Sequence, residues 1–245
     1  MENEEAKKEN KKDENKNVII AIVIVIGMIG LLIIGGIVYA RLTEDKCIND
    51  TGYYWDDQRR PIVVEKPIIY LYPTEETRVN ISLGRPENLT HTYPKYIDSW
   101  NVIAKPNGDL IDLKTGRNLY ALYWEGINTI PSNMKEGFVV KGEDTISFLE
   151  EKLALLGLNE REAAEFIIYW LPQLENNKYN FIRFQTTEEI DENMPLKVTP
   201  VPDTVIRVMM EFKGLEEEIS VKEQQIQTPI REGFIVVEWG GTEIK

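Results

Sequence analysis

Two glutamates of this sequence, Glu125 and Glu238, stand in similar contexts. Residues 124–126 are Trp-Glu-Gly and residues 238–241 are Glu-Trp-Gly-Gly, so each acid adjoins a tryptophan near the predicted end of a strand. An aromatic cleft around a carboxyl group raises its pKa by desolvation. Paired acids of this kind flank the scissile bond in glycosidases. One hypothesis is therefore a cell-wall glycan hydrolase in which Glu125 and Glu238 are the catalytic pair.

The competing interpretation of these acids is structural. Both would then lie at rims of the sheet, one of them paired with Arg183, and the neighbouring glycines would make turns. The two interpretations predict different geometry. A hydrolase needs the two carboxyl groups about 5 to 10 Å apart in one open cleft. Structural acids lie far apart or are buried against an arginine, and this is the interpretation that we favour.

Aromatic residues form a second group of candidates, because they could contact a carbohydrate or a peptide. The candidates for ligand contact are Tyr70, Tyr72, Trp124 and Trp239. The predicted N-terminal strands carry a whole strip of aromatic residues, namely Tyr70, Tyr72, Tyr93, Tyr96, Tyr120, Tyr123, Trp100 and Trp124. Aromatic side chains also pair across the strands of ordinary sheets. We therefore favour packing over ligand binding for this strip.

The sequence lacks the motifs that mark most catalytic and cofactor-binding sites. It has no phosphate-binding loop, dinucleotide fingerprint, zinc-protease motif, serine-hydrolase motif or calcium loop. His91 is the only histidine, in a polar stretch that predicts a strand or loop. We therefore predict no metal site and no cofactor. Cys47, the only cysteine, could join two chains by a disulfide or remain a free thiol, and we favour the free thiol.

The elements that must position these residues are mostly strands. From residue 62 onward, apolar residues recur with period two between short turns, which is typical of strands. The pair Asn107-Gly108 favours positive φ at both central positions of a hairpin turn. The predicted strands are 67–73, 78–84, 100–104, 110–113, 119–125, 179–185, 196–199, 204–213 and 233–239.

The middle of the chain changes to a helical period. Residues 143–156 carry one apolar stripe, with Gly157 as a C-terminal cap. Asn159 begins a second helix with a capping box, and Pro172 is expected to end it. We therefore predict an α+β domain over residues 62–245: a largely antiparallel sheet or sandwich with an inserted helical hairpin at about 143–172.

A single transmembrane helix is predicted to precede this domain. Residues 18–40 are 23 residues without a charge, a length of about 34 Å as a helix. Residues 1–17 are almost entirely Glu, Lys, Asn and Asp and predict a disordered tail, and residues 41–61 predict a polar stalk. Five lysines precede the apolar segment, which favours a cytoplasmic N-terminus and an extracellular domain. Cleavage of the segment as a signal peptide after Ala40 is the alternative.

The charge of the chain excludes one class of partner. The net charge is −13 at pH 7, and about −12 of it lies beyond the apolar segment. Such a surface repels nucleic acid, whose recognition needs a basic face. We therefore expect partners other than nucleic acid: the membrane through residues 18–40, and an envelope protein or polymer through the domain.

Four phrases of the sequence together resemble a known group of proteins. They are Lys-Pro-Ile-Ile-Tyr-Leu-Tyr-Pro at 66–73, Tyr-Trp-Glu-Gly at 123–126, Asn-Phe-Ile-Arg-Phe-Gln at 180–185 and Val-Val-Glu-Trp-Gly-Gly at 236–241. In this order, they resemble a family of uncharacterised, often membrane-anchored or secreted proteins of Gram-positive bacteria. The resemblance extends from about residue 66 to the C-terminus, and it implies no particular activity.

The function expected from the sequence is that of a non-catalytic binding or interaction module at the cell envelope. This expectation depends on the missing catalytic motifs, the acidic charge and the aromatic content. The glycan hydrolase is the alternative, and a structural part of a larger membrane assembly is a third hypothesis.

Overall fold

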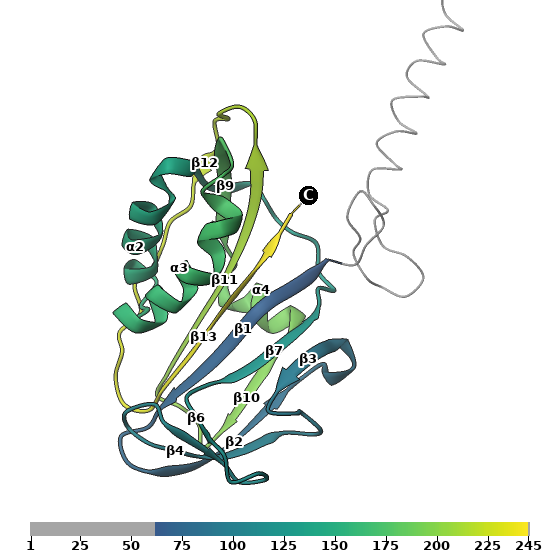
Figure 1. Cartoon of the computed structure of the whole chain (residues 1–245), viewed down its shortest axis with the longest axis vertical. Helices are drawn as coiled ribbons and strands as arrows, with labels where there is room; N and C mark the ends of the chain where they lie inside the picture. The colour runs from purple at the N-terminus through teal and green to yellow at the C-terminus, as the bar shows by residue number, and fades with distance from the viewer. Residues whose placement is uncertain (1–61, 245) are drawn as a thin grey trace, which may run out of the picture. The chain divides into compact units, whose positions relative to one another are not determined.

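Three strands contain nearly continuous runs of apolar residues: β1 (Val63–Tyr72), β11 (Thr204–Leu215) and β13 (Ile235–Glu243). Such runs are typical of strands that are buried on both faces. In the computed structural model, which describes residues 62–244, these strands lie side by side in an eight-stranded sheet. A helical hairpin covers one face of this sheet and a second sheet covers the other (Figure 1).

The eight-stranded sheet is mostly antiparallel. Its order is β12-β8-β9-β11-β13-β1-β7-β3, and the pairs β11–β13 and β12–β8 are parallel. Its remaining strands are β3 (Leu89–Tyr93), β7 (Leu122–Ile127), β8 (Glu136–Lys141), β9 (Tyr179–Phe184) and β12 (Lys222–Glu223). The five strands of the second sheet, in spatial order, are β10 (Leu196–Thr199), β2 (Thr77–Leu83), β4 (Trp100–Ala104), β5 (Leu110–Asp112) and β6 (Asn118–Leu119). The predicted α+β class with mostly strand structure is confirmed.

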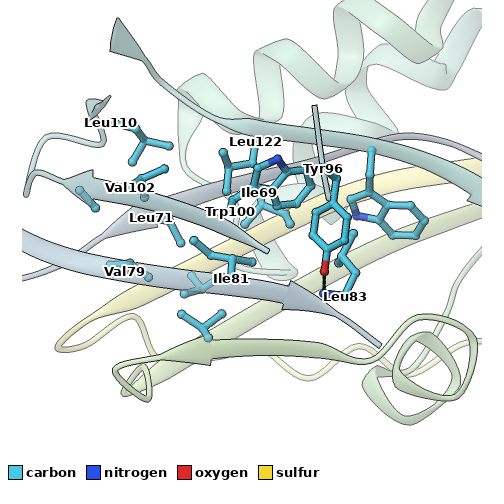
Figure 2. Packing of buried hydrophobic residues seen from close by; sticks show 14 of the residues in the cluster. Ile69, Leu71, Val79, Ile81, Leu83, Tyr96, Trp100, Val102, Leu110 and Leu122 are labelled. Carbon is cyan, nitrogen blue, oxygen red and sulfur yellow. Dashed lines mark hydrogen bonds between the residues drawn. The ribbon is translucent and has the colours of Figure 1, made fainter. Parts of the chain in front are cut away.

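A first hydrophobic core lies between the two sheets. Figure 2 shows Ile69 and Leu71 of β1 facing Val79 and Ile81 of β2, and all four side chains are fully buried. The hydroxyl oxygen of Tyr96 accepts a hydrogen bond from the backbone N–H of Leu83 at 2.9 Å (Figure 2). Burying aliphatic and aromatic surface in this layer is the main force that holds the second sheet on the first.

A second hydrophobic core lies under the helical hairpin. The hairpin consists of α2 (Thr145–Leu155) and α3 (Glu160–Leu174), and a single 3-10 turn, η2 (Gly142–Asp144), precedes it. Leu149 and Leu153 of α2 and Phe166 and Trp170 of α3 are fully buried against the sheet. The structure thus confirms the predicted hairpin. Its apolar stripe is confirmed in part, because Leu149 and Leu153 are buried whereas Ile146 is exposed.

The ends of the two helices agree only in part with the prediction. Gly157 ends the first helix with φ of +89°, and Asn159 and Glu162 form the predicted capping box. Pro172 does not end the second helix, which continues to Leu174. The proline removes only the N–H that would bond to the carbonyl of Ile168, and Ile168 is exposed, so solvent can satisfy that carbonyl.

The predicted hairpin at Pro106 to Asp109 forms, but its turn differs from the expectation. Only Gly108 has positive φ, and its N–H donates to the carbonyl of Lys105 at 2.9 Å. Pro106 therefore occupies the position of a β-turn that proline favours, and the Asn-Gly pair is not central in the turn. The meander predicted for 119–125 is also divided, because β6 belongs to the second sheet and β7 to the first.

Several expectations concern residues outside the described range. The tail at 1–17, the transmembrane helix at 18–40, the stalk at 41–61 and the thiol of Cys47 all lie there. Within residues 62–244, none of the helices has the length and apolar composition needed to span a bilayer. A short helix, α4 (Thr187–Asn193), and another 3-10 turn, η1 (Pro86–Asn88), complete the elements of this range.

Candidate functional site

Glu238 is a buried structural group. It lies in the middle of β13, on the face toward the second sheet, and its side chain is fully buried. Its carboxylate accepts hydrogen bonds from Nε1 of Trp124 at 2.8 Å and from Nε of Arg207 at 2.6 Å. A carboxylate enclosed in this way has no path to a substrate in bulk solvent.

Glu125 lies on the other face of the same sheet. It shares its side of β7 with Tyr123, which packs against the helix-side core. Its carboxylate accepts the backbone N–H of Lys66 at 3.4 Å and lies 3.4 Å from Nδ1 of the exposed His91. Since Glu125 and Glu238 are separated by the sheet itself, the structure does not form the paired acids that the glycan-hydrolase hypothesis requires.

Arg183 does not pair with either of those glutamates. Its guanidinium group, which is almost fully buried, donates to Glu211 at 2.8 Å and to Glu189 at 2.6 Å. The arginine that pairs with Glu238 is Arg207, one strand further along the sheet. One of the two glutamates is indeed buried against an arginine, but the arginine is Arg207 and not the predicted Arg183.

A short helix that the sequence interpretation missed covers both arginines. In α4 (Thr187–Asn193), Glu189 bonds to the first arginine and Asp191 to the second. A capping box starts the helix, because the side chain of Thr186 accepts the N–H of Glu189 and the Glu189 carboxylate accepts the N–H of Thr186. Thr and Glu three residues apart were the signal in the sequence.

The aromatic candidates are mostly interior residues. Trp124, Trp239 and Tyr70 are 2% exposed or less, so none of them can form a platform for a ligand. The hydroxyl group of Tyr70 donates to Glu165 at 2.7 Å. Burial, and then this hydrogen bond to a carboxylate, hold the pKa of Tyr70 far above its ordinary value. Packing is therefore the correct interpretation for these three residues.

Tyr72 is the one half-buried member of the four aromatic candidates. The guanidinium of Arg231 lies over its ring at 5.6 Å, and burial followed by the charge of Glu162 raises its pKa. Arg231 is itself held by a bidentate ion pair with Glu162, at 2.9 and 3.1 Å. Within residues 62–244 the exposed aromatic residues are Tyr93 and Tyr120, and Arg161 lies over the ring of Tyr120 at 5.1 Å.

The glycines beside Glu238 have a different role from the predicted one. Gly240 and Gly241 do not make a turn, because both lie inside β13 and neither has positive φ. A Cβ atom on Gly241 would lie 2.7 Å from Cζ2 of Trp170. These glycines therefore allow close packing against the strand.

A groove of about 570 Å³ lies beside α4, in a part of the domain that the sequence interpretation did not single out. One wall is the start of α4, the floor is the start of β11, and the other wall is the segment 224–229. Its lining is rich in amides and hydroxyl groups. The lining residues are Leu156, Phe184, Gln185, Thr186, Thr187, Glu188, Val205, Ile206, Arg207, Gln224, Gln225, Ile226, Gln227, Thr228 and Pro229.

The charged groups of this groove are few. Arg207 donates to Glu238, to Asp191 and to the carbonyl of Met194, so its guanidinium group is already bound. Glu188 is exposed at the first turn of α4. Among residues 62–244, no group of three or more His, Cys, Asp or Glu side chains is placed to hold a metal ion.

In comparisons with known proteins, no family model, no curated protein and no solved structure matches this chain. The resemblance noted from its four phrases therefore stays a prediction, and the function has to be inferred from the groove and the groups around it.

Proposed function

We propose that this chain is a single-pass membrane protein that displays residues 62–244 outside the cell as a non-catalytic binding module at the cell envelope. The uncharged segment 18–40 supports the anchor, because a run of that length and composition is stable only across a bilayer. The lysines of residues 1–17 support the orientation, since basic residues remain on the cytoplasmic side.

The groove beside α4 is the observation that carries the binding function. Its volume of about 570 Å³ falls in the range of ligand sites, about 300 to 1,000 Å³. Seven of its fifteen lining side chains are amides or hydroxyl groups, which donate and accept hydrogen bonds without transferring protons. The arginine at its floor is fixed by two carboxylates and a carbonyl. Such a lining holds a ligand in place and supplies no evident acid–base pair.

The experiment is co-sedimentation of the purified full chain, in detergent micelles, with washed envelopes of the cell that makes it. Binding should saturate, and Gln225→Trp should weaken it at least tenfold, because Gln225 is exposed and lines the groove. The matched control is Ile168→Trp, since Ile168 is 74% exposed on α3 and does not line the groove. Equal binding by the two variants would refute the groove as the site.

A further inference from the structure

The groove runs along the start of β11, where this strand has no hydrogen-bonded neighbour on the β9 side. β9 pairs with β11 from Leu215 back to Met210, which faces Phe184. The chain then leaves the sheet to form α4, while β11 continues to Thr204. On this side, no strand among residues 62–244 pairs with the start of β11, from Thr204 to Arg207. A strand from the middle of the sheet therefore has an open edge, about 13 Å long for four residues at the usual rise.

The groups along this edge can be identified from the ladder beside it. The carbonyl of Met209 accepts the N–H of Gln185 at 2.9 Å, so the main-chain groups of Met209 point toward β9. Because the direction alternates along a strand, those of Arg207 and Val205 point the same way, into the groove. The intervening residues bond to β13 on the other side. The groove floor thus offers the donors and acceptors that an added strand requires.

A side-chain amide already binds to the main chain at the end of β9, beside this open edge. The side-chain amide of Gln224 accepts the N–H of Phe184 at 2.9 Å and donates to the carbonyl of Phe184 at 2.6 Å. In this way it imitates a peptide unit of a neighbouring strand at the place where β8 begins, at Glu136. Gln224 lines the same groove, and no side-chain amide of the described residues bonds in this way to the neighbouring strand β11.

The two walls of the groove differ in chemistry. Leu156 and Ile226, on the wall toward the helical hairpin, are apolar and pack against the helix-side core. On the α4 wall Glu188 is exposed, and the single guanidinium of Arg207 is shared by two carboxylates. No other basic side chain lines the groove. A strand that enters it therefore meets the apolar side chains of Leu156 and Ile226 on one side and the exposed carboxylate of Glu188 on the other.

We propose that the groove binds an extended segment of a partner polypeptide, in which apolar and basic residues alternate, and that the segment adds as a strand to the open edge of β11. Recognition by strand addition takes its affinity from main-chain hydrogen bonds and its specificity from alternate side chains. This inference rests on the proposed binding function and names the chemical class of the ligand.

The test uses the full chain in detergent micelles and fluorescence anisotropy of a labelled, blocked pentapeptide, Val-Lys-Val-Lys-Val. Two isomers are compared with it, one N-methylated on both lysines and the other on the second and third valines. In an added strand only alternate amides face β11. One isomer should therefore lose at least tenfold in affinity while the other stays within threefold. Equal affinity of the two isomers would overturn strand addition.

The matched variants change the edge of the protein. Val205→Pro removes an N–H that faces the groove and that the ladder with β13 does not use, so the fold should persist. It should weaken peptide binding at least tenfold, whereas Val205→Ala keeps the N–H and should stay within threefold. An equal effect of the two substitutions would contradict a main-chain contact.

A third set of measurements changes the charge of the groove or of the peptide, and it separates this inference from the proposed function. Glu188→Gln should lower the affinity for the lysine peptide several-fold, and a Val-Glu-Val-Glu-Val peptide should not bind. If neither peptide binds while envelope binding still depends on Gln225, the peptide inference is wrong and the binding function stands. If the envelope binding is also absent, both are wrong.

Discussion

At the scale of single residues, two of the three charged catalytic candidates, Glu238 and Arg183, are part of the interior, whereas Glu125 is partly exposed. Glu238, Arg207, Arg183 and Glu211 are all 6% exposed or less and are bonded to one another in two pairs. A buried charge is tolerated only when a partner and hydrogen bonds compensate its lost hydration. A glutamate beside a tryptophan in a strand-rich sequence is therefore as compatible with an interior ion pair as with an active site.

The pair Arg207–Glu238 leads to a prediction about stability. Arg207→Met should lower the free energy of unfolding by about 3 to 5 kcal/mol, because it leaves the Glu238 carboxylate buried without its cation. The added substitution Glu238→Gln should recover part of this loss, since it removes the charge and keeps an acceptor for Trp124. Urea unfolding of the full chain measures both.

The control for this prediction is Asp191→Ala. The side chain of Asp191 is 52% exposed, so its ion pair with the same arginine should contribute less than about 1 kcal/mol. A larger loss in Asp191→Ala than in Arg207→Met would contradict the importance given to burial.

Four tyrosines with raised pKa values should make the free energy of unfolding depend on pH in the alkaline range. Burial, followed by neighbouring carboxylates, raises the pKa of Tyr70, Tyr72, Tyr123 and Tyr169, the last to about 12. Unfolded tyrosines ionise near pH 10. Above that pH the folded chain binds more protons than the unfolded chain. The contribution of these tyrosines to the free energy of unfolding is therefore fully present below about pH 10 and is lost as the pH rises further.

The measurement is the urea midpoint of the full chain at pH 8, 10 and 11. Tyr169→Phe should show a smaller fall between pH 10 and 11 than the unchanged chain, because it removes one of the groups that retains its proton in the folded state. An identical fall in the two proteins would exclude Tyr169 as a contributor.

At the scale of elements, close contacts between the helical hairpin and the sheet decide which residues β13 tolerates. A Cβ atom on Gly241 would lie 2.7 Å from Trp170 and 2.8 Å from the carbonyl oxygen of Met210. Gly241→Ala should therefore lower the free energy of unfolding by about 1 to 3 kcal/mol through overpacking.

The comparison for this element is Gly214→Ala, at the exposed end of β11. The atoms nearest to its added Cβ would be those of the side-chain amide of Asn177, at 3.1 Å, so the change in urea midpoint should be smaller. If Gly214→Ala destabilised the chain as much as Gly241→Ala, loss of glycine as such, and not contact with α3, would be the cause.

At the scale of the whole molecule, the anchor at residues 18–40 gives a prediction about topology. The full chain should remain with the membrane fraction after an alkaline wash, because water cannot replace lipid around its 23 uncharged residues. Protease added to intact protoplasts should remove the domain. A protein recovered in the soluble fraction, or protected from the protease, would show that the predicted topology is wrong.

The sequence by itself determined the features that depend on neighbours along the chain. Period-two and helical spacing located most strands and both helices of the hairpin, and the capping box placed the start of α3 at Asn159. These features are local, since hydrogen bonds and apolar stripes within an element repeat at fixed intervals. The charge balance and the apolar segment are likewise read directly from composition.

Only the tertiary structure decided which groups meet. The sheet separates Glu125 from Glu238, and Arg207 reaches Glu238 because β11 and β13 lie in parallel register although 31 residues separate the two side chains. The groove exists because β9 ends before its neighbour and α4 begins there. Strand order and the relative ends of neighbouring strands depend on long-range packing, which no local spacing in the sequence specifies.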